Sequence, residues 1–361
     1  MKRRKQQLMR NVFLVVILGL SPVIFGGSLE PDGPPAPTMK TLDEVEPRIP
    51  ISQDDIPLTI TQEGSYYLTE DVTASASAII VEVNDVTIDL MGYRLLGSGA
   101  GYGVYINGQT NVEVRNGTVH GFYTGIYEYS SSLRNHRVIN VRAVSNAFYG
   151  IRLSGYGNLV RDCTVAENGY YGISGGTGAL VTGNISYNNQ GGGIGAGNGS
   201  TVIGNTAINN DTYGIYAGNG CTVSNNTSYG NQSWGIRGGY GSNVSGNTSR
   251  DNQNTGIQAD NGCTVTGNTV YNNAGDGINA YNGSTVKGNT AYGNQASGIY
   301  VYTGGSVIGN TSYDNQNYGI YLAGNSLADQ NTSYWNNRSG GGYSNMNSCG
   351  TCTITSSNHA P

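Results

Sequence analysis

Charged side chains are scarce in the C-terminal half of this chain. Residues 172–343 contain only four Lys or Arg and six Asp or Glu. Most of these acids stand beside Asn or Gln in turn positions, where they substitute as solvated polar groups. Asp260 and Asp276 are expected to face outward, but from opposite ends of a strand. That placement argues against a glycosidase with two carboxylates about 5 Å apart, and the region shows no cluster of metal ligands.

Phenylalanine and positive charge are also lacking. The chain has 27 Tyr but only four Phe, whereas a core built on aromatic rings would use more Phe, because Tyr prefers half-wet surfaces.

The formal net charge is −5, and residues 1–28 carry five positive charges and no negative ones, so the remainder has a net charge of −10. This acidity argues against a nucleic-acid partner.

Long hydrophobic runs are limited to one N-terminal stretch. The run at residues 12–25 follows five basic residues and precedes Gly26-Gly27-Ser28. A basic segment, a short apolar segment and small residues in this order predict a secretory signal peptide at residues 1–28. An uncleaved membrane anchor is the alternative, although the run is short for a span. Export would place the protein in the periplasm, at the cell surface or in the medium of a bacterium.

A strict 21-residue repeat runs through residues 172–319. Gly-Ile recurs with this spacing at Gly172, Gly193, Gly214, Gly235, Gly256, Gly277, Gly298 and Gly319. One Asn column keeps the same step at Asn184, Asn205, Asn226, Asn247, Asn268, Asn289, Asn310 and Asn331. A second one comprises Asn168, Asn189, Asn210, Asn231, Asn252, Asn273, Asn294, Asn315 and Asn336. Such regularity indicates one small unit stacked on copies of itself.

The apolar pattern within a unit is short and alternates every second residue, as in strands, with no helical stripe. Twenty-one residues suit one three-sided turn of a parallel β-helix, in which each strand pairs with its copies about 4.8 Å above and below. Ile and Val then stack inward. The Asn columns are expected at the corners, because Asn tolerates left-handed backbone and its amide can bond the same Asn of the next coil.

These repeats resemble the right-handed parallel β-helix (PbH1-type) proteins of the pectate-lyase-like superfamily. The resemblance implies an all-β fold, a right-handed single-stranded parallel β-helix with coils of about 21 residues and an N-terminal cap. It implies less about activity, because the superfamily includes lyases, glycosidases, epimerases and surface adhesins. In the superfamily, the face that carries the Gly-Ile strands is commonly where the polysaccharide groove lies.

Five segments are predicted along the chain. They are a signal peptide (1–28), a Pro-rich linker (29–38), N-terminal cap strands (39–78), the β-helix (79–345) and a C-terminal cap or tail (346–361). The coil that begins at Gly125 is 25 residues long, because it carries extra residues within 128–137. Insertions in a solenoid usually form loops on one face, often the binding face.

Aromatic residues gather beside the Gly-Ile strands. The predicted binding residues on this face are Tyr129, Tyr149, Tyr171, Tyr213, Tyr216, Trp234 and Arg237. Tyr and Trp rings can pack against the C–H faces of sugars while their polar atoms make hydrogen bonds. The alternative is aromatic stacking that only stiffens the sheet. Arg237 and Asp260 are expected to meet diagonally as an ion pair.

A local excess of arginine suggests chemistry in the irregular coils. Residues 94–161 contain seven Arg against two Glu, and Arg can bind the carboxylate of a uronate in bidentate fashion. The predicted site has Arg152 with Arg134 or Arg137 on the carboxylate. His136 or Tyr127 is the base that removes the C5 proton. The alternative is a solvated basic belt that docks on the acidic N-terminal cap.

The sequence therefore favours a secreted β-helix protein that binds an extracellular polysaccharide. Whether it also cleaves the polymer by lyase-type β-elimination or epimerises it is left open. The main alternative is a non-catalytic structural or adhesive rod at the cell surface, and a more remote one is an ice- or mineral-binding surface. No cofactor or metal is indicated, and a calcium requirement and the oligomeric state are left open. No membrane contact is expected beyond the signal segment.

Overall fold

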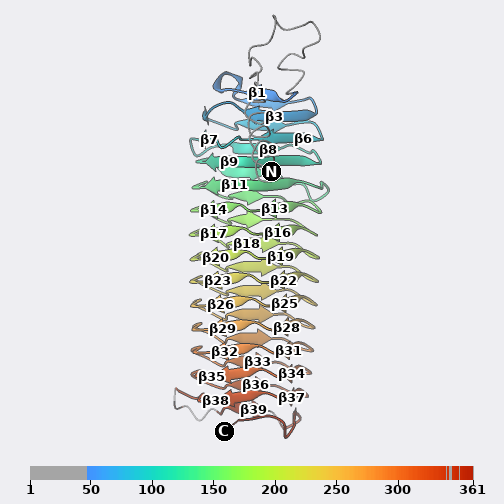
Figure 1. Ribbon diagram of the computed structural model, residues 1–361, viewed down its shortest axis with the longest axis vertical. Coiled ribbons are helices and arrows are strands. Elements are labelled where there is room, and N and C mark those ends of the chain that lie inside the picture. Colours follow the sequence, from blue (N-terminus) through green and yellow to red (C-terminus); the bar gives the residue numbers. More distant parts are fainter. Residues whose placement is uncertain (1–46, 339, 341–343, 349, 361) are drawn as a thin grey trace, which may run out of the picture. The chain divides into compact units, whose positions relative to one another are not determined.

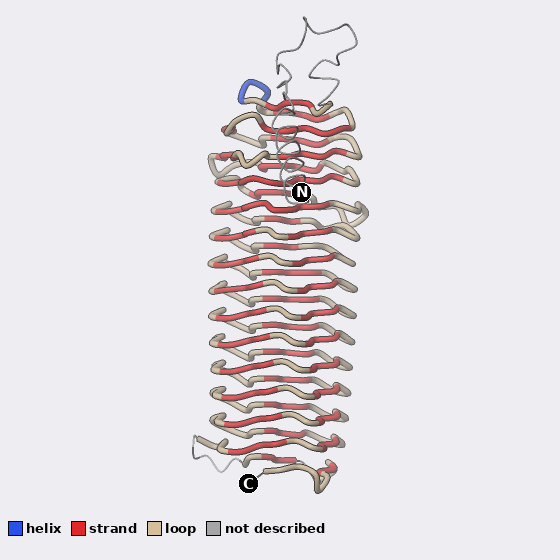
Figure 2. Tube along the Cα trace, viewed as in Figure 1, coloured by secondary structure: helices blue, strands red, loops and turns tan. Residues whose placement is uncertain are grey.

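The computed structural model describes residues 47–338, 340, 344–348 and 350–360. The predicted signal peptide and Pro-rich linker lie outside this part of the chain. Residues 48–361 form one compact unit, in which short strands joined by turns follow one another as stacked coils (Figure 1). Helical structure among the described residues is a single 3-10 turn, η1 (Gln53–Asp55), near the N-terminal end (Figure 2). Within the same residues, no helix has the length and hydrophobicity of a membrane span.

One parallel sheet of 14 strands takes one strand from each coil. Its strands are β2 (Leu58–Ile60), β5 (Ile79–Val81), β8 (Tyr102–Ile106), β10 (Thr124–Tyr127), β12 (Ile151–Arg152), β15 (Ile173–Ser174), β18 (Ile194–Ala196), β21 (Ile215–Ala217), β24 (Ile236–Gly238), β27 (Ile257–Ala259), β30 (Ile278–Ala280), β33 (Ile299–Val301), β36 (Ile320–Leu322) and β39 (Met346–Ser348). We call the outer surface of this sheet the Gly-Ile face.

The other two sides of each coil form a 26-stranded sheet that bends at a corner. Its N-terminal strands are β1 (Ile49–Ile51), β3 (Gly64–Leu68), β4 (Val72–Ala74), β6 (Val86–Asp89), β7 (Arg94–Gly97), β9 (Val112–His120), β11 (Arg137–Val144), β13 (Leu159–Arg161), β14 (Thr164–Ala166), β16 (Leu180–Thr182), β17 (Ile185–Tyr187), β19 (Thr201–Ile203) and β20 (Thr206–Ile208). The remainder are β22 (Thr222–Ser224), β23 (Thr227–Tyr229), β25 (Asn243–Ser245), β26 (Thr248–Arg250), β28 (Thr264–Thr266), β29 (Thr269–Tyr271), β31 (Thr285–Lys287), β32 (Thr290–Tyr292), β34 (Ser306–Ile308), β35 (Thr311–Tyr313), β37 (Leu327–Asp329), β38 (Thr332–Tyr334) and β40 (Thr353–Ile354).

The register between coils follows the repeat. Ile194 pairs with Ile215, and Gly195 pairs with Tyr216, so equivalent residues of successive coils lie side by side. The Ile and Val columns are buried, as predicted, and they form one continuous hydrophobic core. Every second residue of a strand therefore faces outward. The repeat alone thus decides which residues reach the surface.

Both Asn columns are buried ladders inside the solenoid. Asn247, for example, is 1% exposed, and its side-chain amide donates to Oδ1 of Asn268 at 3.0 Å. The predicted bond between equivalent Asn residues is confirmed. The predicted left-handed backbone is wrong for the ladder residues themselves, because it belongs to the residue before each of them, such as Asn225 with a φ of 55° and Gly246 with a φ of 64°.

The coils extend beyond the predicted boundaries at both ends. At the N-terminal end, β1 pairs in parallel with β3, and β2 pairs in parallel with β5, so residues 49–78 form coils in register with the rest. At the other end, β39 and β40 pair with β36 and β37. The strands of the predicted caps are therefore coils themselves, because their backbone groups pair with the neighbouring coil as in the repeats.

Candidate functional site

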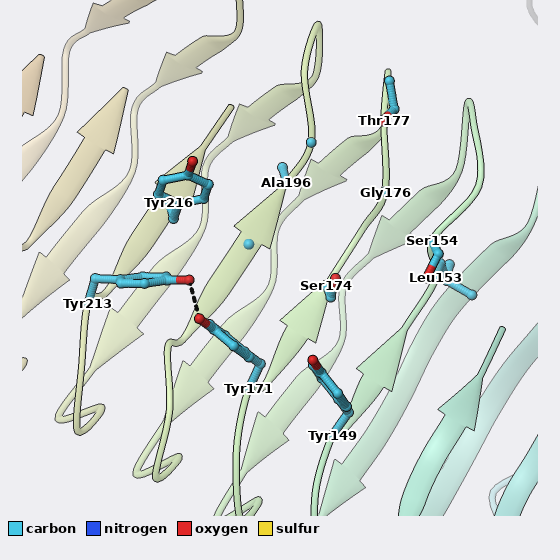
Figure 3. A pocket seen from close by; sticks show the side chains of 12 residues that line it. Tyr149, Leu153, Ser154, Tyr171, Ser174, Gly176, Thr177, Ala196, Tyr213 and Tyr216 are labelled. Carbon is cyan, nitrogen blue, oxygen red and sulfur yellow. Dashed lines mark hydrogen bonds between the residues drawn. The ribbon is translucent and has the colours of Figure 1, made fainter. Parts of the chain in front are cut away.

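A hollow on the Gly-Ile face arises from one coil that has almost no outward side chains. Gly195 and Gly197 occupy outward positions of that coil and line a pocket of about 300 Å³. Tyr171 and Tyr213, from the coils on either side, reach toward each other across it (Figure 3). Their hydroxyl groups form a hydrogen bond of 2.6 Å. The missing side chains of a single coil therefore create the pocket.

Four of the predicted binding residues line this pocket: Tyr149, Tyr171, Tyr213 and Tyr216. They form a continuous row, with ring centroids 5.8 Å apart for Tyr149 and Tyr171, 5.6 Å for Tyr171 and Tyr213, and 5.5 Å for Tyr213 and Tyr216. Ser154, Ser174 and Thr177 also line it. The positions of these tyrosines beside Gly-Ile predict a shared face, but the cavity between them arises only in the tertiary structure.

The pocket is uncharged. None of the twelve lining residues has a charged side chain (Figure 3). Burial raises the pKa of Tyr149, Tyr171 and Tyr213 above that of an exposed tyrosine, because desolvation disfavours the phenolate. These three hydroxyl groups are therefore protonated at neutral pH and can donate hydrogen bonds. As bases they are poor.

Arg152 flanks the pocket on the N-terminal side. It lies on β12, and its guanidinium carbon is 5.0 Å from the ring centroid of Tyr149 and 5.6 Å from that of Tyr127. Tyr127 is also stacked against Tyr129, whose ring is 55% exposed, at 6.1 Å. The cation is thus held by ring faces. No ion pair to Arg152 is found within the described residues, so its charge is available to an acidic ligand.

The opposite flank also carries an arginine, but its charge is compensated. Arg237 is 3.1 Å from the carboxylate of Asp260, which confirms the predicted diagonal ion pair. Its guanidinium lies over the rings of Trp234 and Tyr216, at 5.2 and 5.6 Å. Eight predicted residues thus lie in two adjacent outward columns of the Gly-Ile face: Tyr127, Arg152, Tyr216 and Arg237 in one, and Tyr149, Tyr171, Tyr213 and Trp234 in the other.

The structure separates the predicted base His136 and the predicted binding residues Arg134 and Arg137 from these columns. His136 is 0% exposed, because it precedes β11 in an inward column, so it cannot contact a polymer on the surface. Arg137 lies on β11 in the 26-stranded sheet and pairs with Glu113 at 3.1 Å. Arg134 is exposed in the loop before β11. The predicted grouping of His136 and Arg137 with Arg152 is therefore wrong.

Much of the basic belt pairs with acids of neighbouring coils. Arg94 contacts Asp71 at 2.7 Å, and Arg115 contacts Asp89 at 2.9 Å. The Arg94–Asp71 pair agrees with the alternative of a basic belt that docks on the acidic N-terminal cap, because Asp71 lies within residues 39–78. Partly exposed pairs of this kind each add little stability. Arg152 is distinguished from them by its position over tyrosine rings.

Sequence reasoning missed one buried acid. Glu128 directly follows β10 and is 0% exposed. Its Oε2 accepts hydrogen bonds from the backbone N–H groups of Ser154 and Gly155, at 2.9 and 3.0 Å. The register of Tyr127 with Arg152 places Glu128 in the inward column of Leu153, and this register was the available signal. Among the described residues, no three His, Cys, Asp or Glu side chains form a group that could hold a metal ion.

Comparison with known proteins gives a family and several structures of similar fold. The family described as "Right handed beta helix region" matches residues 72–233 and 175–312. The periplasmic alginate epimerase AlgG is 14% identical, with 86% of this chain and 82% of that chain covered and a TM-score of 0.52. The A-module of the mannuronan C-5 epimerase AlgE6 from Azotobacter vinelandii is 18% identical, with 83% and 91% covered and a TM-score of 0.49. Pectate lyase Pel9A is 18% identical, with 71% of each chain covered and a TM-score of 0.42. A search of curated proteins finds no match. At these identities the likeness concerns the fold.

Proposed function

This chain belongs to the right-handed β-helix family, and from that premise we propose that it binds a polysaccharide along the Gly-Ile face. The observation that carries the proposal is the glycine coil between Tyr171 and Tyr213. It opens an uncharged pocket walled by aromatic rings with protonated hydroxyl groups. Its volume of about 300 Å³ is at the lower end of the range for ligand sites.

The line of aromatic residues on both sides of the pocket supports a polymer as the ligand. Sugar C–H faces pack against Tyr and Trp rings, and the hydroxyl groups of both partners can form hydrogen bonds. Arg152 favours an acidic sugar next to the pocket, because its guanidinium can bind a carboxylate. The alginate epimerase that shares the fold acts on a polysaccharide, which is the ligand class proposed here. Export of the protein by residues 1–28 belongs to the same proposal.

Catalysis by β-elimination or epimerisation is the second candidate, and Arg152 is the observation in its favour. Of the predicted catalytic residues, Arg152 and Tyr127 lie together on the Gly-Ile face. A structural rod is favoured by a different feature, the stacked rings of Tyr271, Tyr292 and Tyr313 on the 26-stranded sheet, at 4.8 and 4.9 Å. Such stacking stiffens a solenoid without a ligand.

Filling the pocket tests the binding function. Gly195→Tyr introduces a ring that points outward, and a Cβ at this position meets only the Ile173 carbonyl oxygen, at 3.6 Å, which is an ordinary contact. We expect retardation on a glycan affinity gel to fall at least about tenfold, because the added ring occupies the space of the ligand. Ser245→Tyr, an outward position of the 26-stranded sheet, is the matched control and should bind as the wild type does. Equal binding by both variants would refute the proposed site.

A panel of neutral and acidic polysaccharides, with and without calcium, separates the three functions. New reducing ends and the ultraviolet absorbance of unsaturated uronate should be followed together with gel retardation. Retardation without turnover is the expected result. Rising absorbance on a uronate polymer would establish a lyase and direct mutagenesis to Arg152 and Tyr127. No new reducing ends, no change in absorbance and no retardation would favour the structural rod.

A further inference from the structure

Two buried titratable residues occur at the two ends of the same insertion loop. Glu128 precedes the loop of residues 129–135, and His136 follows it. Both side chains are 0% exposed. Each has one polar atom without a hydrogen-bond partner among the described residues, namely Oε1 of Glu128 and Nε2 of His136. An unpaired buried polar atom is costly, so two in one coil require an explanation.

The register shows that the two side chains occupy facing inward columns. Glu128 shares a column with Leu153 and Gly175, and His136 shares one with Asn158 and Ala179. In the regular coil, a Cβ built on Gly175 would lie 3.4 Å from the Cβ of Ala179. In the regular coil, side chains at these two positions therefore meet inside one corner of the solenoid.

The unpaired atoms are chemically complementary. Nδ1 of His136 accepts a hydrogen bond from the backbone N–H of Val112, at 3.4 Å. A neutral imidazole that accepts at Nδ1 carries its proton on Nε2, so the unpaired atom of His136 is a donor. Oε1 of a Glu128 carboxylate is an acceptor, because Oε2 already accepts two backbone N–H groups. The unpaired atom of His136 is thus a donor and that of Glu128 is an acceptor, and neither has a hydrogen-bond partner among the described residues.

We propose that His136 Nε2–H and Glu128 Oε1 form a proton-sharing pair inside the coil, directly or through one enclosed water, and that this pair positions the loop beside the tyrosine pocket. Glu128 also holds the backbone of Ser154, which lines the pocket. A single buried water can satisfy two such groups. Closing the base of the loop in this way fixes the edge of the pocket and the exposed ring of Tyr129.

Acid breaks the pair. If Oε1 is protonated, its O–H and the Nε2–H of His136 are both donors and cannot bond to each other. If Nδ1 of His136 is protonated, it can no longer accept the hydrogen bond from the N–H of Val112. Burial raises the pKa of Glu128, so its carboxylate is protonated at a less acidic pH than an exposed glutamate. The charged group that acts on Glu128 is Arg152 on β12. Next to His136, Arg137 and Glu113 are paired with each other on the outside.

The pair itself is tested without a glycan. The nitrogen chemical shifts of the His136 ring should show the Nε2–H tautomer at neutral pH. Amide hydrogen exchange in residues 129–135 should accelerate as the pH falls to about 4, after correction for the intrinsic pH dependence. In a Glu128→Leu/His136→Asn double variant, both positions carry the residues of the next coil, Leu153 and Asn158. This variant should fold and lose the excess acceleration. Glu128→Gln, which has nearly the same shape, should shift the His136 ring signals.

Glycan binding gives a second readout, which rests on the function proposed above. Retention by the wild type should fall at least about fivefold between pH 7 and pH 4, and that of the double variant should stay flat. An Nδ1–H tautomer, or unchanged exchange of the loop in all three proteins, would overturn the pair. Absence of retention at every pH, with the tautomer and exchange as expected, would instead overturn the binding function and leave the pair standing.

Discussion

Replacing Asn247 by Ala should lower the free energy of unfolding by about 3–5 kcal/mol, because several buried polar groups lose their partners at once. Oδ1 of Asn247 accepts hydrogen bonds from the backbone N–H and the side-chain amide of Asn226, at 2.9 and 3.0 Å. Its own amide donates to the Val223 carbonyl at 2.9 Å and to Asn268 Oδ1 at 3.0 Å. The substitution removes all four bonds in the interior of the solenoid.

Denaturation with urea, followed by circular dichroism, measures this effect. The matched control is Asn243→Ala in the same coil, at an exposed outward position of β25, where surface substitutions change stability by about 0.5 kcal/mol or less. Because each coil contacts only its neighbours, the damage should be concentrated at the coils around Asn247. Similar losses for the two variants would show that the ladder does not hold the coils together.

Acidification from about pH 6.5 to about pH 4 should remove up to about 3 kcal/mol of stability through His136 alone. Burial lowers the pKa of His136 from 6.5 to about 4. The unfolded chain therefore binds a proton in this range that the folded chain does not, so stability is complete above about pH 6.5 and is lost as the pH falls. The urea midpoint as a function of pH measures the loss.

Carboxylates also titrate in this pH range, so the contribution of His136 is obtained by comparing the pH dependence of stability of the wild type with that of a His136 variant. His136→Asn places there the residue of the next coil, Asn158, and should flatten the slope of stability between pH 6.5 and pH 4. His120→Asn, at a half-buried position of β9, makes the same side-chain change outside the inserted coil and is the control. An unchanged slope in His136→Asn would mean that folding does not lower the pKa of this imidazole.

Some elements of the site were predictable because the columns repeat. The outward placement of Tyr171, Tyr213 and Tyr216 follows from their positions beside Gly-Ile, and the Arg237–Asp260 pair follows from their diagonal spacing. His136 was misplaced because the inserted residues of the 25-residue coil make counting forward from the Gly-Ile strand unreliable. Counting back from Val138, which pairs with Val160, places His136 at an inward position.

The sequence by itself determined the coil, because a strand in this fold pairs only with its own copies 21 residues away. Inward Ile and Val, buried Asn ladders and the outward row of tyrosines all follow from that one spacing. Only the tertiary structure decided where the site lies. Tyr171 and Tyr213 meet across two coils through space that Gly192 and Gly195 leave open. Likewise, the inserted coil turned Glu128 and His136 inward, because strand register and not sequence distance sets which face a side chain joins.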